Sequence, residues 1–257
     1  MTKPIETSPV HFPEHQTAKD DEYYRRLNEY YDLSPGTNLD KLRAFTKYVP
    51  VAELGRFLAK NAIFQQIVGV QGSIVECGVF NGGGVMAWAT LSAIYEPLNH
   101  LRRVIGFDTF AGFTSISQQD DTQGINAHTV AGGLAARSEQ DLAECVRIFD
   151  VYRPLGHIPK VELVKGDAVH SMAGYLERNA HLVVALLYLD FDLYDPTRRA
   201  LEVFIPRMPK GAIIAFDQLN ERHWPGETCA LVETVGVRSL RLQRFPFQPQ
   251  ISYAVLD

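Results

Sequence analysis

Five short apolar runs constrain the fold of this 257-residue chain more than any other feature. They cover residues 73–77, 104–107, 161–164, 183–189 and 212–216. Helical stretches separate most of them, at 85–95, 168–179 and 196–206, and two more strand-like segments follow at 240–244 and 252–256. Alternating strands and helices predict a parallel sheet with helices on both faces, the doubly wound α/β class.

Acidic residues follow four of these runs. Asp108, Asp190 and Asp217 stand directly after theirs, and Asp167 follows the third run after Lys165 and Gly166. Parallel sheets bind their ligands beyond the carboxyl ends of the strands. We therefore expect the functional site at this edge of the sheet.

Charge and cysteine content argue against several classes of protein. The net charge is −5 at pH 7, whereas nucleic-acid binding favours a basic surface. The three cysteines are far apart and form no C-x-x-C pair, which is typical of neither a disulfide framework nor a zinc site. No apolar run reaches the ~18 residues of a membrane span, and the N-terminus lacks the apolar core of a signal peptide. We expect a cytoplasmic protein without nucleic-acid or membrane partners.

The first 69 residues predict a helical extension or lid that precedes a main domain at 70–257. Residues 1–20 are rich in proline, histidine and acids, and we expect them to be loosely ordered. A helix at 20–31 and further helices within 39–69 follow from the apolar spacing. Four tyrosines either pack a helix on the core or form part of a lid over a substrate: Tyr23, Tyr24, Tyr30 and Tyr31.

Residues 111–150 are longer than a simple crossover between two strands requires, which indicates an insertion. The polar start of this segment, 115–126, predicts a surface loop or a lid.

The segment after the first run, Glu76-Cys-Gly-Val-Phe-Asn-Gly-Gly83, opens a helix. Glycines let the backbone approach a ligand closely, and a helix N-terminus offers free N–H groups. The G-x-G-x-x-G pattern of a dinucleotide site is absent, and Glu76 would repel a pyrophosphate. The loop suits a cationic ligand such as S-adenosylmethionine (SAM), and Glu76, Gly78, Asn81 and Gly82 are its candidate contacts.

Two later acids extend this cofactor site. Asp108 is placed to accept hydrogen bonds from ribose hydroxyls, and Asp167 to approach the adenine. The alternative is that both acids are helix N-caps. The other candidate contacts of the cofactor are Thr109, Phe110, Ala168 and Asp190.

Three motifs together resemble the macrocin O-methyltransferase family: Glu76–Gly83, Gly106-Phe-Asp-Thr-Phe-Ala-Gly112 and Leu189-Asp-Phe-Asp-Leu-Tyr-Asp195. The resemblance covers roughly residues 40–256. It implies a class I, Rossmann-like methyltransferase sheet of about seven strands, and a divalent metal, usually magnesium. Family members methylate deoxysugar hydroxyls in antibiotic biosynthesis, so a sugar or glycoside is the expected substrate. An enediyne pathway such as that of calicheamicin is the narrower expectation.

The resemblance also assigns roles to the acids. Asp190 is the implied first metal ligand and Asp192 the implied base. The family's fifth strand ends in two adjacent aspartates, both metal ligands, whereas this chain has Asp217-Gln218. Gln218 can ligate only through an uncharged amide oxygen, so the metal is expected to bind more weakly or to be absent.

The chemistry of the residues supports a cation near these acids. The expected strand order 3-2-1-4-5-7-6 makes the strands ending at Asp190 and Asp217 neighbours, about 4.8 Å apart. Asp190 and Asp192 share a face if the segment is extended, and like charges there are costly without a cation. Asp195 precedes Pro196 and is most simply the N-cap of the next helix.

Two residues beyond the fifth run are alternative site residues. His223 either replaces Asp192 as the base or is an exposed loop histidine. Glu221 is likewise either a substitute metal ligand or an exposed loop residue.

Three other functions remain open at this point. One is metal-dependent methylation of a catechol or another small phenol, which uses the same layout. Another is a nicotinamide oxidoreductase, which the missing glycine pattern disfavours. The last is a catalytically inactive binding protein, favoured only by Asp217-Gln218. The sequence allows a homo-oligomer without indicating one.

Overall fold

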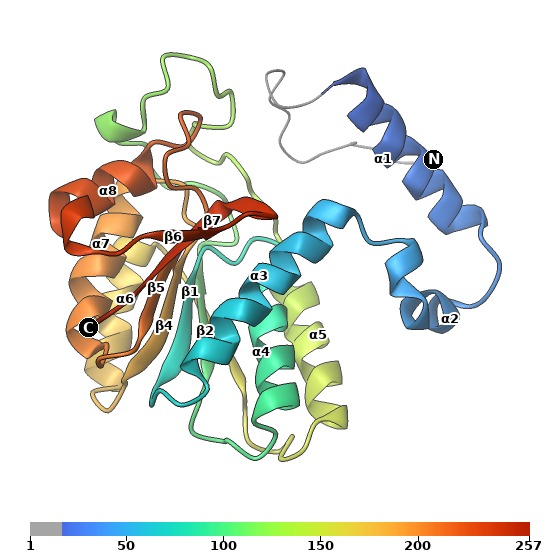
Figure 1. Cartoon of the computed structure of the whole chain (residues 1–257), viewed down its shortest axis with the longest axis horizontal. Helices are drawn as coiled ribbons and strands as arrows, with labels where there is room; N and C mark the ends of the chain where they lie inside the picture. The colour runs from blue at the N-terminus through green and yellow to red at the C-terminus, as the bar shows by residue number, and fades with distance from the viewer. Residues whose placement is uncertain (1–16) are drawn as a thin grey trace. The chain divides into compact units, whose positions relative to one another are not determined.

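Seven strands form one sheet in the computed structural model, which describes residues 17–257 (Figure 1). The strand order is β3-β2-β1-β4-β5-β7-β6, and β7 is antiparallel to β5. The strands are β1 Ser73–Cys77, β2 Val104–Asp108, β3 Val161–Lys165, β4 Val184–Leu189, β5 Ile213–Phe216, β6 Gln243–Phe245 and β7 Gln248–Val255. The predicted fold class and strand order are confirmed.

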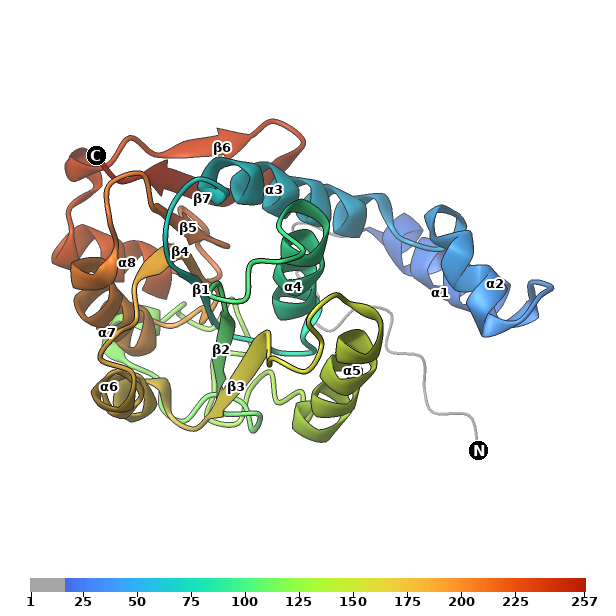
Figure 2. The ribbon, with the colours of Figure 1, turned by 90° about the horizontal axis from the view of Figure 1, so that it is seen from below.

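Helices cover both faces of the sheet (Figure 2). The helices that do so are α3 Val51–Ile67, α4 Gly83–Tyr95, α5 Glu139–Tyr152, α6 Ala168–Arg178, α7 Tyr194–Phe204 and α8 Gly226–Thr234. Two further helices, α1 Ala18–Leu33 and α2 Asn38–Arg43, precede them in the chain. The buried side chains of α3, α4 and α5 pack on one face, and those of α6, α7 and α8 on the other. The sheet is therefore doubly wound, as the alternation of the sequence predicted.

The central strand β4 explains why one run of the sequence is continuously apolar. All six of its residues are buried, because helices cover both sides of a parallel sheet. Tyr188 contacts Trp88 of α4 on one face, with ring centroids 5.5 Å apart. Phe107 of β2 contacts Phe204 of α7 on the other face, at 5.7 Å.

The parallel strands end at one level along the sheet. Cys77 pairs with Phe107 and with Leu189, and Leu189 pairs with Phe216. The residues that follow these four positions, Asp108, Asp190 and Asp217 among them, therefore emerge side by side. Gly78 is the fourth, and it is required there: its φ is +97°, and an added Cβ would lie 1.9 Å from the carbonyl oxygen of Asp190.

The chain divides into two compact units between Leu54 and Gly55. Most of α3 thus belongs with the sheet, whereas the sequence suggested a boundary at residue 69. In the N-terminal unit, Thr17 and Asp20 form a capping box at the start of α1. The expected disorder of residues 1–20 is wrong for 18–20, which are helical, and residues 1–16 lie outside the described part of the chain.

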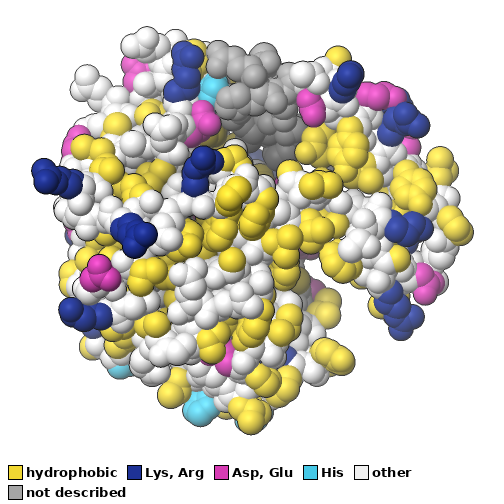
Figure 3. Space-filling view, in the orientation of Figure 1, with side chains coloured by type: hydrophobic (Ala, Val, Ile, Leu, Met, Phe, Trp, Pro, Cys, Tyr) yellow, Lys and Arg dark blue, Asp and Glu magenta, His cyan; other side chains and the backbone are white. Residues whose placement is uncertain are grey.

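Aromatic packing organises the N-terminal unit. The rings of Tyr30 and Tyr31 contact Tyr48, at centroid distances of 5.7 and 5.2 Å. Large apolar side chains also remain exposed on this unit, Leu33 and Leu42 among them. Figure 3 shows hydrophobic side chains, in yellow, on the surface of α1 and α2. Within residues 17–257, no helix is both long and apolar enough to cross a membrane.

The segment between β2 and β3 differs from its prediction in two ways. Residues 139–152 form α5, the ordinary crossover helix, so the additional segment is only 111–137. That segment is not a simple surface loop, because Asp120, Thr122 and Asn126 are buried.

The start of α7 was also predicted wrongly. Its N-cap is Leu193, and Asp195 lies inside the first turn without capping the helix. The backbone N–H of Tyr194 instead donates to Oδ1 of Asp120, at 2.7 Å. A helix N-terminus needs acceptors for its free N–H groups, and here a carboxylate from a distant loop provides one.

Candidate active site

Asp108 holds the glycine-rich loop between β1 and α4. Its Oδ2 accepts from the backbone N–H groups of Val79, at 2.7 Å, and Phe80, at 2.9 Å. Its Oδ1 accepts from the N–H of Phe110, at 2.7 Å. Both carboxylate oxygens of Asp108 therefore hold the backbone of neighbouring loops. The sequence had predicted a contact with the ribose of the cofactor and not this structural role.

The remaining candidate cofactor residues surround this loop. Gly82, with a φ of +82°, is the N-cap of α4, and Asn81 beside it is exposed. Thr109 uses its hydroxyl in its own turn, where it donates to the carbonyl of Gly112 at 2.7 Å. Phe110 is buried in the core.

Asp167 is the N-cap of α6, as the alternative reading of the sequence held. Its Oδ1 accepts from the N–H of Val169 at 2.9 Å, and its Oδ2 accepts from the Thr114 hydroxyl at 2.7 Å. Ala168 is the first residue of α6 and is buried.

Glu76 lies on β1 beneath the first turn of α4. An added Cβ on Gly84 would meet its Oε1 at 2.3 Å, so the glycine makes room for the carboxylate. Burial raises the pKa of Glu76 to about 7, although the nearby Lys60 opposes the shift. Glu76 is therefore a buried carboxyl group beside the glycine-rich loop, and it binds a proton more readily than an exposed glutamate does.

Lys60 of α3 is a site residue that sequence reasoning missed. Its side chain is buried, and its ammonium lies 3.7 Å from the ring centroid of Tyr188 and 5.4 Å from that of Trp88. Burial lowers the pKa of Lys60, while the Glu76 carboxylate opposes this. The signal was present: Lys60 occupies the same apolar stripe as Ile63, Phe64 and Ile67.

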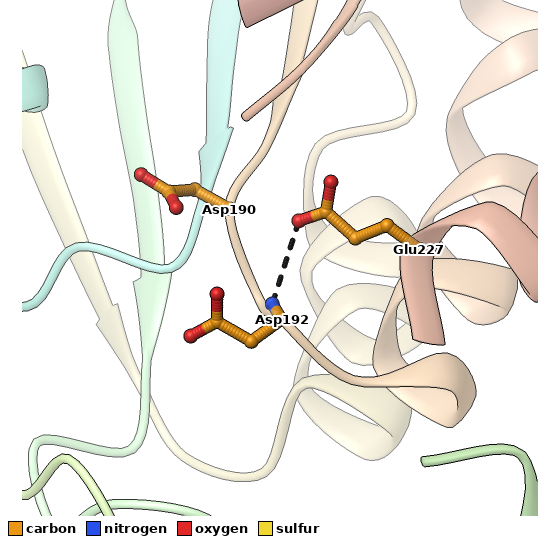
Figure 4. A group of neighbouring side chains, drawn as sticks. All are labelled: Asp190, Asp192 and Glu227. Atoms are coloured by element: carbon orange, nitrogen blue, oxygen red, sulfur yellow. Dashed lines mark hydrogen bonds between the residues drawn. The ribbon is translucent and has the colours of Figure 1, made fainter. Parts of the chain in front are cut away.

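Asp190, Asp192 and Glu227 bring three carboxylates together (Figure 4). One oxygen from each lies within 4.8 Å of the others. Asp190 and Asp192 follow β4 and their carboxylates point to the same side, while Glu227 reaches them from α8. The segment is not extended, since Asp192 has a φ of +63°, so the shared side arises from a sharp turn.

Glu227 also binds the backbone of the two loops beside it. Its Oε1 accepts from the N–H of Asp192 at 3.4 Å, and its Oε2 accepts from the N–H of Gln218 at 3.2 Å. The carboxylate thus links the loop after β4 to the loop after β5. Sequence reasoning missed Glu227, because acids are common in the first turn of a helix and no neighbouring residue distinguishes this one.

Burial and mutual repulsion raise the pKa of all three carboxyl groups. Burial is the larger cause for each, followed by Asp217 for Asp190 and Asp192, and by Asp190 for Glu227. The pKa of Asp192 rises to about 8. Such a group of buried acids is stabilised by a bound cation.

Asp217 does not join this group, although it ends the strand beside Asp190. Arg56 donates to both of its oxygens, at 2.5 and 2.6 Å, and the Tyr188 hydroxyl donates to Oδ1 at 2.5 Å. Burial would raise the pKa of Asp217, but Arg56 and Lys60 outweigh it and the pKa lies below its usual value. Sequence reasoning missed Arg56 because the carboxylate that it pairs with lies 161 residues away in sequence.

His223 is buried, with a relative exposure of 2%, so the exposed-loop reading is wrong. Its Nδ1 lies 2.8 Å from Oε1 of Glu221, and its backbone carbonyl accepts from Asn126 at 2.8 Å. Glu221 is thus engaged with this histidine and is not part of the three-carboxylate group.

The sheet order with an antiparallel β7, the glycine-rich loop after β1 and the acids at the strand ends together define a class I SAM-dependent methyltransferase. The model of the macrocin O-methyltransferase family, TylF, matches residues 57–229. The chain belongs to the macrocin O-methyltransferase family, and it is an O-methyltransferase that uses SAM.

Solved structures agree with this assignment. A crystal structure of the calicheamicin methyltransferase CalS11 is 29% identical, has a TM-score of 0.89 and covers 99% of this chain and 98% of its own. An apo structure of CalS11, described as a TDP-rhamnose 3'-O-methyltransferase of calicheamicin biosynthesis, is 31% identical, with a TM-score of 0.81 and coverage of 94% and 96%.

The O-methyltransferase NovP shares the fold, at 18% identity, a TM-score of 0.63 and coverage of 79% of this chain and 80% of its own. A comparison with the curated proteins finds no match.

We predict that Asp108→Ala weakens SAM binding at least tenfold. The variant releases three backbone N–H groups, and each such bond to a charged acceptor contributes about 1.5–3 kcal/mol. Calorimetric titration with SAM measures the change, and Asp121→Ala, on an exposed acid of the 111–137 segment, is the control. Unchanged affinity in a folded Asp108→Ala protein would contradict this role.

Proposed function

We propose that this enzyme transfers the methyl group of SAM to a hydroxyl of a deoxysugar carried on a nucleoside diphosphate, in natural-product biosynthesis. Similarity to CalS11, which is described as acting on TDP-rhamnose, extends over nearly the whole chain. The observation that carries the proposal is Asp192, a buried carboxylate beside Asp190 at the carboxyl edge. A sugar hydroxyl is a poor nucleophile until a group such as this removes its proton.

Asp192 has the properties of a general base. Its Oδ1 has no hydrogen-bond partner among the described residues, and burial raises its pKa to about 8. A carboxylate with a raised pKa accepts a proton more readily once it is ionised. SAM supplies a methyl group on a positively charged sulfur.

The atoms balance in one displacement. Asp192 takes the proton of the acceptor hydroxyl while the hydroxyl oxygen forms a bond to the methyl carbon. The carbon–sulfur bond breaks, and its electron pair stays on sulfur to give S-adenosylhomocysteine. Positioning of the two reactants provides much of the rate of such a reaction.

The cluster of three carboxylates, Asp190, Asp192 and Glu227, also fits Mg²⁺. Its donors are all oxygens, the ligands that Mg²⁺ prefers, and they lie within 4.8 Å of one another. Gln218 adds a buried amide oxygen, Oε1, without a hydrogen-bond partner among the described residues. Asp190, Asp192 and Glu227 would hold the ion, which supplies positive charge that lowers the pKa of a nearby hydroxyl.

This assignment departs from the ligand set Asp190, Asp217 and Gln218 that the resemblance implies. Arg56 already neutralises Asp217, and its guanidinium binds both carboxylate oxygens. Glu227 occupies the place beside Asp190 and Asp192 instead.

The function is tested by a direct comparison of acceptors. With labelled SAM, we expect methyl transfer to a TDP-deoxysugar to exceed transfer to the free sugar, and no transfer to a catechol. Mass spectrometry of the products measures this. Preferred methylation of the catechol would replace the proposed function with the phenol alternative.

For the metal, we predict that EDTA lowers activity and that Mg²⁺ restores it. In Mn²⁺ titrations followed by electron paramagnetic resonance, Glu227→Gln should weaken binding at least tenfold, because it removes a negatively charged ligand. Asp217→Asn should change it less than threefold, since Arg56 holds that carboxylate. If Asp217→Asn weakens Mn²⁺ binding and Glu227→Gln does not, the ligands are Asp190, Asp217 and Gln218, as the family resemblance implies.

For the base, Asp192→Asn is expected to lower kcat by about 10²–10⁴-fold and to leave SAM affinity nearly unchanged. His223→Ala should have a much smaller effect. Because Asp192 is also a candidate ligand, the Mn²⁺ affinity of the same variant separates the two roles. Normal turnover by Asp192→Asn together with an inactive His223→Ala would make His223 the base.

A further inference from the structure

Asp120 is a buried carboxylate that the proposed chemistry does not use. It lies in the segment 111–137, outside the three sequence motifs, and is 2% exposed. Its Oδ2 accepts from the backbone N–H of Ser117 at 3.0 Å and from the Ser117 hydroxyl at 2.6 Å. Its Oδ1 accepts from the backbone N–H of Tyr194 at 2.7 Å. The segment 111–137 thus binds the backbone at Tyr194, two residues beyond Asp192.

The same carboxylate touches the start of α8. An added Cβ on Gly226 would lie 2.3 Å from Oδ1 of Asp120 and 2.4 Å from the nitrogen of Tyr194. The residue after Gly226 is Glu227, which accepts from the N–H of Asp192. Two carboxylates therefore hold the backbone on the two sides of Asp192.

Asp192 needs such support because of its backbone. Its φ of +63° is a left-handed conformation that a residue with a side chain adopts only at a cost. The surrounding structure must fix that turn for the carboxylate to stay beside Asp190. Glu227 fixes the N–H of Asp192 itself, and Asp120 fixes the first N–H of α7.

Three other contacts anchor the segment that carries Asp120. Asn126 donates to the backbone carbonyl of His223 at 2.8 Å. The ring of Phe113 contacts that of Trp224, with centroids 5.9 Å apart. Thr114 donates to Asp167 at 2.7 Å. Because it is tied at several points, the segment can serve as a fixed support.

We propose that Asp120 is a positioning residue for methyl transfer: by binding the N–H of Tyr194 it holds the turn that presents the Asp192 carboxylate to the acceptor hydroxyl. The inference rests on the proposed function, in which Asp192 faces the acceptor. It assigns the segment 111–137 a role in turnover, where its polar start predicted a surface loop or a lid.

The central experiment compares Asp120→Ala, Asp120→Asn and Asp195→Ala. Asp120→Ala is expected to lower kcat about 10- to 100-fold, as displacement of a catalytic group by about 1 Å does, with SAM affinity within threefold of the wild type. Asp120→Asn retains an oxygen for the Tyr194 N–H and should recover at least fivefold of that loss. Asp195→Ala removes a half-exposed acid of the same helix turn and should keep full kcat.

A control variant that destabilises the fold at a distant position shows whether the loss of kcat in Asp120→Ala comes from lost positioning or only from lost stability. Met172→Ala truncates a fully buried side chain of α6 and is expected to lower the melting temperature without lowering kcat. If Asp120→Ala keeps kcat within threefold, or loses no more than Met172→Ala does, the proposal is overturned. If Asp120→Ala does not fold, Ser117→Ala, which loosens only Oδ2, should lower kcat two- to fivefold, and full activity there would overturn the proposal.

Hydrogen–deuterium exchange tests the proposal without turnover. The amides of residues 190–195 should exchange at least tenfold faster in Asp120→Ala than in Asp195→Ala or the wild type. Unchanged exchange in a folded Asp120→Ala protein would overturn the positioning role. If the wild type methylates no TDP-sugar, the proposed function fails, and the exchange result still decides whether Asp120 holds the turn.

Discussion

Burial of negative charge at one edge of the sheet is the constraint on which the rest of the site depends. Parallel strands end at the same level, so acids that follow them emerge together. Like charges in a region of low dielectric constant repel strongly. Helix α3 supplies two cations against this repulsion: Arg56 binds Asp217, and Lys60 lies near Glu76. No cation of the described residues pairs with Asp190, Asp192 or Glu227 in this way, and burial and mutual repulsion keep the pKa of each carboxyl group raised.

A second use of carboxylates concerns the backbone. Asp108, Asp120 and Glu227 accept hydrogen bonds from main-chain N–H groups of neighbouring loops. Loops at the carboxyl edge expose N–H groups that no strand or helix satisfies, and a buried carboxylate can accept two or three of them. The acids thus shape the loops of the methyltransferase as well as the chemistry between them.

Sequence reasoning succeeded where the signal is local. The apolar runs marked β1 to β5, and the continuous run at β4 marked a strand covered on both faces. Reasoning failed where a local rule met a tertiary alternative. Asp195 has the sequence context of an N-cap, yet Asp120 provides the acceptor. His223 is in a polar stretch, yet the structure buries it beside Glu221.

The sequence alone determined the alternation of strands and helices and the placement of Asp190 and Asp192 at the carboxyl end of β4, because periodicity and short motifs are properties of neighbouring residues. The strand order came from the resemblance that those motifs carry. Only the tertiary structure decided how charges are paired. Arg56 and Asp217 are 161 residues apart, and Asp120 and Tyr194 are 74 apart. Such pairs depend on how helices and loops pack on the finished sheet, and burial then makes each pairing costly to leave unmade.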